Sequence, residues 1–251
     1  MEDFSRLKVN VVLEKGSIDE YQKAIYFFWD KLTKLNINIF IIKKIFEFPF
    51  DIFCSLQNSI FFSTAIWNIY ENSVLIITKL ATDKGTDLHT LLHFKNWVRE
   101  QIKEEYKSDF RQKLREVKFD LGTKKIFKKA KDLRNYVLAH FNRNKLEQTP
   151  KLNLSELEKL NDKLNSLFDV LTFNCEYDMF PPSYSENVIL SNGVNHQTDI
   201  EALFDPIAKN SEILNMPERS PELWKELKES YNEDRIKIIN KYRKKFNLPE
   251  I

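Results

Sequence analysis

The residues whose types and spacing best suit chemistry lie in one run, Arg134 to His140, with the sequence RNYVLAH. A guanidinium is always charged and stabilises negative charge on phosphate oxygens, whereas an imidazole titrates near neutral pH and exchanges protons. Six positions separate the two residues, so they do not share one stripe of a helix. A long Arg side chain can still converge with the imidazole in a shared cleft, and the pair would then suit reactions at a phosphate ester.

Positive charge surrounds this run. Residues 121–145 contain eight Lys and Arg residues and one acidic residue, Asp132, which makes them +7 in a chain whose total is only +2. A local basic face concentrates phosphate-bearing partners, but a lysine run is also the common solvated face of a helix. Both interpretations remain open.

The element that must position the run is a predicted helix over residues 121–145. Its apolar side chains recur at steps of three and four and share one arc: Ile126, Phe127, Ala130, Leu133, Val137, Leu138 and Phe141. The lysines from 124 to 131 lie outside this arc. Arg134 lies inside it, where a guanidinium is rare without a partner. Arg134 therefore either binds a ligand or forms hydrogen bonds with backbone carbonyls or a buried carboxylate. His140 is either a catalytic residue or simply a residue that terminates the helix.

A second predicted helix, over residues 50–81, is apolar nearly all round and belongs in the centre of a bundle. Its polar residues include Asn68, Glu71, Asn72 and Lys79. We expect Glu71 to lie near Arg134 and to pair with it, because a buried Arg and a buried carboxylate each need a partner. The alternative is that Glu71 faces water on a narrow polar strip.

An Arg followed by a polar residue, a short apolar spacer and Ala-His near a helix end resembles the signature of the HEPN superfamily. In this chain the motif runs from Arg134 through Asn135 to Ala139 and His140. Residues 67–97, WNIYENSVLIITKLATDKGTDLHTLLHFKNW, are similar to the second and third helices of the HEPN-like branch in bacterial abortive-infection proteins. The resemblance extends over residues 17–175.

The resemblance implies an all-α fold, a HEPN-like antiparallel helical bundle that often dimerises and pairs two motifs in one cleft. Many members are metal-independent endoribonucleases, and others only bind nucleotides or a protein partner. The leading function is thus an endoribonuclease that acts as a toxin or an antiphage effector. The alternatives are a non-catalytic module that binds nucleotides or nucleic acid, and an interaction protein whose apolar faces form a dimer.

Seven residues are expected at this site. Arg134 and His140 are the catalytic pair, and Glu71 supports Arg134. The residues expected to bind substrate are Asn135, Tyr136, Lys131 and Arg143. Tyr136 can stack a base or donate its hydroxyl, but a regular helix would point Asn135 away from Arg134. The expected partners are RNA or a nucleotide, a second copy of the chain, and an antitoxin or other regulatory partner.

Metal and cofactor sites are not predicted. His89 and His93 have the four-residue spacing that lets two imidazoles bind one metal. No Glu stands beside the first His, and no third ligand is evident beyond Asp87. The sequence also contains no Gly-rich phosphate loop and no Cys-x-x-Cys pair.

Composition favours a soluble, cytoplasmic helical protein. Two cysteines and no signal peptide point to a reducing compartment, and 4 Gly with 30% charged residues favour long helices. Residues 37–53 are interrupted by charges and by Pro49, which excludes an ordinary membrane span there, so no membrane partner is expected.

We expect two parts: a bundle over residues 1–175, and a linker with a C-terminal helical extension over residues 176–251. In the bundle, a helix from a capping box at Ser17 and Glu20 should reach about Leu35 and continue after a bend. Asp87 should cap a helix over 88–99, residues 100–118 should form an exposed arm, and Asn153 or Ser155 should cap a helix to Leu171. Two helices are predicted over 199–213 and 221–246, followed by a basic end, KYRKKF, that is a solvated tail or a second phosphate-facing patch.

Overall fold

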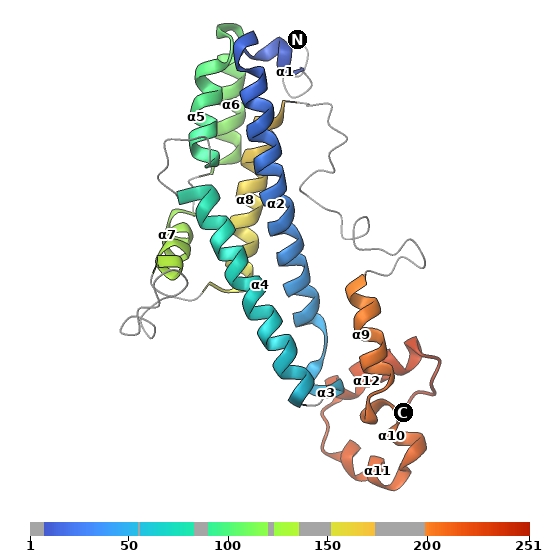
Figure 1. Cartoon of the computed structure of the whole chain (residues 1–251). Helices are drawn as coiled ribbons and strands as arrows, with labels where there is room; N and C mark the ends of the chain where they lie inside the picture. The colour runs from blue at the N-terminus through green and yellow to red at the C-terminus, as the bar shows by residue number, and fades with distance from the viewer. Residues whose placement is uncertain (1–7, 55, 83–89, 120–122, 136–151, 174–198) are drawn as a thin grey trace. The chain divides into compact units, whose positions relative to one another are not determined.

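The computed structural model describes residues 8–54, 56–82, 90–119, 123–135, 152–173 and 199–251 (Figure 1). Over these residues the protein is all-α, as predicted, and the β-type pairing found in them is one isolated antiparallel bridge between Leu13 and Ile102. The bridge anchors the N-terminal arm, because Leu13 is fully buried and Lys103 N donates to Val12 O at 3.0 Å.

Contacts divide the chain into two compact units. The first comprises residues 1–40 and 68–184, and the second comprises residues 41–67 and 185–251. Two long helices, α2 (Ile18–Glu47) and α4 (Leu56–Thr82), contribute to both units. The expected division into residues 1–175 and 176–251 stays a prediction, and by contacts residues 41–67 group with the C-terminal helices. The expected boundary near residue 176 lies outside the described residues.

The first unit is an antiparallel helical bundle. In it α2 and α4 run in opposite directions (Figure 1). The other helices of this unit are α1 (Val9–Val12), α5 (Leu91–Gln101), α6 (Lys107–Val117), α7 (Lys124–Leu133) and α8 (Leu154–Thr172). The centre of its core is aromatic: Tyr21, Phe28 and Phe94 are fully buried, and the Phe94 ring contacts the other two. The hydroxyl of Tyr21 donates to Leu171 O at 2.6 Å, so α2 and the end of α8 are joined inside that core.

Helix α2 is one continuous helix of 30 residues, so it does not end near Leu35. Its buried positions Leu32, Leu35, Ile39 and Ile42 keep the helical spacing without interruption, and no Gly or Pro occurs between its start and Pro49. The predicted capping box at its start is not among the described contacts. Instead, the hydroxyl of Ser17 donates to Glu14 O at 2.7 Å and closes the turn before the helix.

Three asparagines join α2 to α8 within this bundle. Asn36 Oδ1 accepts from Asn161 Nδ2 at 2.6 Å and from Asn165 Nδ2 at 2.9 Å. Asn161 and Asn165 are each only 8% exposed, so the cluster is a polar network at the edge of an apolar core. Such a network favours one register of the two helices, because any shift would leave buried amides unpaired.

Two predictions for the neighbouring helices are corrected. Thr90 caps α5, its hydroxyl accepting from His93 N at 3.1 Å, whereas the expected cap Asp87 lies outside the described residues. Residues 100–118 are not an exposed arm, because Phe110 of α6 is fully buried and its ring lies 5.8 Å from the Phe173 ring. The many charged residues in this stretch predicted an exposed helix, and the single buried aromatic residue was not recognised in the sequence.

The second unit contains shorter helices. They are α3 (Phe50–Phe53), α9 (Asp199–Lys209), α10 (Glu212–Arg219), α11 (Pro221–Glu229) and α12 (Glu233–Lys245). Each of the two predicted C-terminal helices is therefore two helices, with breaks at 210–211 and 230–232. The core of this unit is again aromatic, with the rings of Phe48 and Phe204 stacked 4.6 Å apart.

The basic end of the chain is only partly a solvated tail. Arg243 is fully buried, pairs with Glu218 and donates to Leu214 O and, at 2.6 Å, to Pro249 O. Lys245 pairs with Asp205 at 2.6 Å. Much of the basic charge of this segment is thus used inside the second unit.

One described helix is long and apolar enough to cross a membrane by length and composition alone. It is the part Ile60–Ala81 of α4, with a mean hydropathy of 1.3. Only 28% of this segment is buried, so α4 is not the fully enclosed central helix that its apolar sequence predicted. One such helix is weak evidence for a membrane span. The charge-interrupted stretch over residues 37–53 is not such a span.

Candidate functional site

Helix α7 carries the basic end of the candidate site. Phe127, Ala130 and Leu133 are buried and pack into the first unit's core, which confirms the predicted apolar arc for its described part. Lys124, Lys125 and Lys128 are exposed, as expected for the opposite face. Val137, Leu138 and Phe141 lie outside the described residues.

The backbone widens into a π-helical turn at Arg134 and Asn135, directly after α7. Arg134 Nε donates to Asn135 Oδ1 at 3.1 Å, and both residues are half-buried. A regular helix would separate these neighbouring side chains, so the wider turn brings together two residues that the sequence pattern placed apart. π-Helical turns are rare in proteins, and those that do occur are often found at functional sites.

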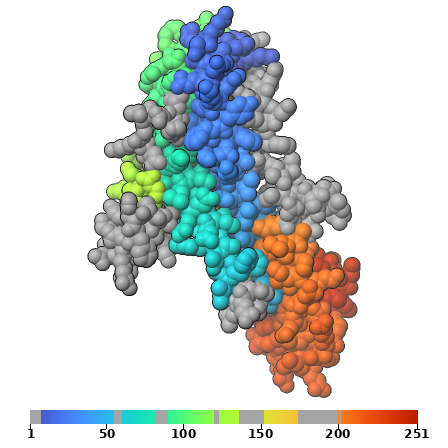
Figure 2. Space-filling model, viewed as in Figure 1, coloured from blue at the N-terminus to red at the C-terminus, as the bar shows by residue number. Residues whose placement is uncertain are grey.

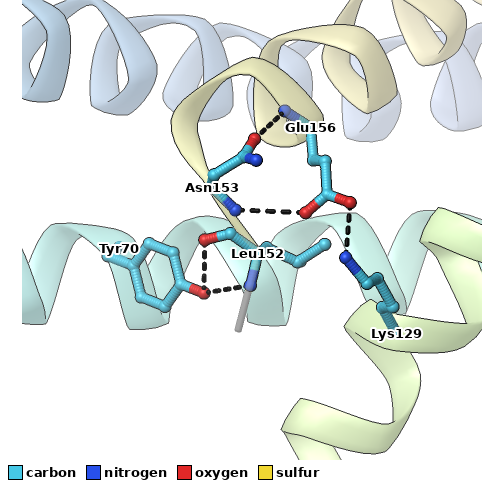
Figure 3. Close-up of polar contacts among 5 residues, drawn as sticks. All are labelled: Tyr70, Lys129, Leu152, Asn153 and Glu156. Atoms are coloured by element: carbon cyan, nitrogen blue, oxygen red, sulfur yellow. Dashed lines mark hydrogen bonds and ion pairs between the residues drawn. The ribbon is translucent and has the colours of Figure 1, made fainter. Parts of the chain in front are cut away.

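An ion pair fixes α7 to the start of α8. Lys129 Nζ lies 2.5 Å from Glu156 Oε1 (Figure 3). Glu156 also completes a capping box with Asn153, whose side chain accepts from Glu156 N at 2.8 Å. The hydrogen bond from Lys129 lowers the pKa of the Glu156 carboxyl. Lys129 therefore positions the helix that carries Arg134 and is not available as part of a free basic face.

Tyr70 of α4 makes a contact between distant segments that the sequence analysis missed. Its hydroxyl lies 3.1 Å from both Leu152 O and Leu152 N, donating to the first and accepting from the second (Figure 3). Burial raises the pKa of the Tyr70 phenol. Leu152 lies two residues before the start of α8, so Tyr70 anchors the point where the chain enters that helix. A hydroxyl on an otherwise apolar helix was the available signal.

The remaining predicted residues have different outcomes. Lys131 is half-buried in the last turn of α7. Glu71 is half-buried on α4, and the described contacts include no hydrogen bond or ion pair between it and Arg134, so that pairing stays a prediction. Tyr136, His140 and Arg143 lie outside the described residues.

The described residues also bear on metal binding. In that part of the chain, no group of three or more His, Cys, Asp or Glu side chains is placed to hold a metal ion. His93 is described and half-buried on α5, whereas His89 lies outside the described ranges.

Comparison with known proteins identifies the family. The family model HEPN_AbiU2, described as AbiU2, matches residues 52–187, which is more than half of the chain and includes Tyr70 and the run from Arg134 to His140. Comparison with curated proteins and with solved structures gave no match. The all-α bundle agrees with the family match. The chain therefore belongs to the HEPN_AbiU2 family, a group of HEPN-like domains associated with abortive infection.

Proposed function

We propose that this protein is a metal-independent endoribonuclease whose catalytic residues are Arg134 and His140. The observation that carries the proposal is the π-helical turn that holds the Arg134 guanidinium against Asn135 within the Arg-to-His run of a HEPN-family domain. A guanidinium oriented in advance suits a phosphate whose negative charge grows during reaction.

The reaction is attack of a ribose 2′-hydroxyl on the adjacent phosphorus. One imidazole accepts the proton of the 2′-hydroxyl as the 2′-O–P bond forms, and a second imidazole donates a proton to the 5′-oxygen as the P–O5′ bond breaks. The products are a 2′,3′-cyclic phosphate and a 5′-hydroxyl end. Arg134 stabilises the charge on the phosphate oxygens during this exchange.

Two imidazoles are supplied by two copies of the chain. His140 of one protomer acts as the base, and His140 of the other acts as the acid. Support for self-association comes from apolar side chains that α4 leaves open to solvent: Ile60 is 66% exposed, Phe61 66% and Trp67 45%. Exposed apolar residues of this size commonly mark protein–protein contact.

The remaining candidates bind the substrate. Lys131 and Arg143 contact the phosphate backbone, and Tyr136 stacks on a base. Asn135 also orients the Arg134 guanidinium, whose Nε donates to its Oδ1. Glu71 supports Arg134 from α4.

The test is cleavage of a mixed pool of structured and single-stranded RNAs in the presence of EDTA. The wild-type protein should leave 2′,3′-cyclic phosphate ends, and His140→Ala should lower the rate about 10²- to 10⁴-fold. Arg134→Ala should lower it about 10²- to 10³-fold, and Arg134→Lys less, because it keeps the charge but not the planar fork. Arg115→Ala is the matched control, since Arg115 is an exposed arginine of α6.

A separate variant tests the role of Asn135. Asn135→Ala should lower kcat with little change in KM, and Asn135→Asp should restore much of it, because a carboxylate oxygen still accepts from Arg134 Nε. Absence of cleavage on every RNA, with RNA binding retained, would assign the protein to the non-catalytic binding modules instead.

The family match supports a role in abortive infection, with the nuclease held in check by an antitoxin or other partner. Expression of the wild-type protein in bacteria should then slow growth, and expression of His140→Ala at the same level should not. Equal growth of both strains at equal protein levels would argue against a toxic nuclease.

A further inference from the structure

A groove runs between α2 and α4 within the first unit, apart from the run that begins at Arg134. Its volume is about 450 Å³, within the range of small-molecule sites. The groove is lined by Lys31 and Lys34 of α2 and by Asn72, Leu75, Ile76, Lys79 and Leu80 of α4. The two helices lie side by side on the face drawn in Figure 2, α2 in blue and α4 in teal.

Positive charge exceeds negative charge in this groove. Lys31 and Lys34 each lie 2.9 Å from a carboxylate oxygen of Asp30, so two ammonium groups share one acid. Hydrogen bonds from Lys34 and Lys31 lower the pKa of the Asp30 carboxyl, which therefore stays ionised between them. Lys79 on the opposite wall has no acidic partner among the described residues.

Two of the three lysines lie near one aromatic ring. Lys79 Nζ lies 5.9 Å from the centre of the Phe27 ring, and Lys31 Nζ lies 5.6 Å from the same centre. A cation over a ring face is attracted to it, so Phe27 gathers two ammonium groups from different helices at one end of the groove. Because these two ammonium groups repel each other, binding of an anion that contacts both is favourable.

The α4 wall of the groove also carries uncharged side chains. Asn72 is exposed and presents an amide that both donates and accepts, and Leu75 is 42% exposed although it is apolar. Along the α4 axis, Asn72 and Lys79 are about 10 Å apart at 1.5 Å per residue. The groove is thus long enough for a ligand that has both an anionic group and an apolar or amide-binding part.

We propose that this groove binds a nucleotide unit, free or within an RNA strand, with its phosphate at Lys31, Lys34 and Lys79 and its base or ribose against Leu75 and Asn72. Lysine binds phosphate as a compact charge with three donors. Three lysines and one carboxylate leave a net positive charge, which suits a phosphate group. The proposal stands without RNA cleavage at Arg134.

The experiment measures binding of two probes by fluorescence anisotropy: a labelled 12-nucleotide single-stranded RNA with 2′-O-methyl riboses, and labelled AMP. The methylated RNA has no free 2′-hydroxyl, so binding is measured without cleavage, and failure of the proposed nuclease activity would leave this test intact. The variant is Lys34→Gln with Lys79→Gln. The matched control, Lys23→Gln with Lys225→Gln, removes the same charge from exposed positions outside the groove.

We expect the groove variant to bind at least tenfold more weakly than wild type, and the control to stay within about twofold. The slope of log K against log salt should also fall by about 0.7 for each phosphate that the variant no longer neutralises. Weaker binding of both probes identifies a site for free nucleotides, and weaker binding of RNA alone identifies a site for the strand. Unchanged binding of both probes, in a variant with wild-type circular dichroism and Tm, overturns the proposal. So does an equal loss of affinity for a labelled oligoglutamate peptide, because the groove would then respond to charge alone.

Discussion

Lys129 Nζ of α7 lies 2.5 Å from Glu156 Oε1 of α8, although 27 positions separate the two residues in the chain. Neither side chain is fully exposed, at 36% for Lys129 and 21% for Glu156. The ion pair gives α7 a fixed position beside the bundle, and Arg134 follows α7 directly. The geometry of the candidate site thus depends on an acidic residue of a different helix.

Glu156 has two separable roles, which two substitutions distinguish. Glu156→Gln keeps the capping box, because Gln also reaches the Asn153 amide, but it removes the ion pair and should cost about 0.5–1 kcal/mol. Glu156→Ala removes both interactions and should cost about 1–2 kcal/mol. Urea unfolding at pH 7 measures both values. Equal costs for the two variants would contradict the double role.

The Glu156 carboxyl should also make the stability of the protein depend on pH. The pKa of Glu156 is lower in the folded state, so its stabilising effect is complete above the unfolded pKa of about 4.3 and is lost as pH falls through the folded value. The stability difference between wild type and Glu156→Gln should therefore shrink between about pH 6 and pH 3. A difference that stays constant over this range would show that the ion pair does not contribute.

Tyr70→Phe removes the hydroxyl that contacts both backbone groups of Leu152. We expect a cost of about 1–2 kcal/mol, because a half-buried donor and acceptor are left unpaired. Burial raises the pKa of the phenol, so the folded state favours its neutral form, and this contribution is lost as pH rises through the folded pKa, above about 10. The stability difference from wild type should thus narrow in alkali. Tyr231→Phe is the control, since the described contacts of the Tyr231 side chain involve its ring.

The asparagine cluster predicts a non-additive result. Asn36→Ala removes the acceptor of Asn161 Nδ2 and should cost about 1–3 kcal/mol, because a buried amide is left without its partner. Replacing Asn36, Asn161 and Asn165 together with Leu should cost less than the single change, since no buried polar group remains. Chemical denaturation checks both variants, and Asn96→Ala on the exposed face of α5 is the control. A triple variant less stable than the single one would show that packing, not polar satisfaction, dominates there.

Because Arg243 is fully buried and paired, we expect the stability of the second unit to depend on this one charged side chain. Arg243→Ala should destabilise it by about 3–4 kcal/mol, because two carbonyls and Glu218 are left without their donor. Glu218→Gln should cost only about 1–2 kcal/mol, since the Glu218 side chain is 46% exposed and Arg243 keeps its carbonyl partners. Lys244→Ala, at an exposed neighbouring position, should have little effect. Near-equal values for Arg243→Ala and Lys244→Ala in thermal unfolding would refute a structural role for Arg243.

Local patterns were sufficient to predict much of the fold. The all-α class, the apolar arc of α7 and the Asn153 cap all follow from spacing within a few residues along the chain. Helix periodicity and capping depend on neighbours three or four positions away, so the sequence contains that information directly. The Arg-to-His run and the HEPN resemblance are local features of the same kind.

Features that depend on distant partners required the tertiary structure. Only packing shows that Lys129 is bound to Glu156, that Arg243 is buried, and that residues 41–67 group with the C-terminal helices. A lysine that pairs and a lysine that binds a ligand look alike in a sequence, because the acid that decides between them can come from any helix. The groove of Lys31, Lys34 and Lys79 likewise exists only because α2 and α4 pack side by side. Residue type and spacing therefore specify the helices, and contacts between helices decide which of their charges are available for function.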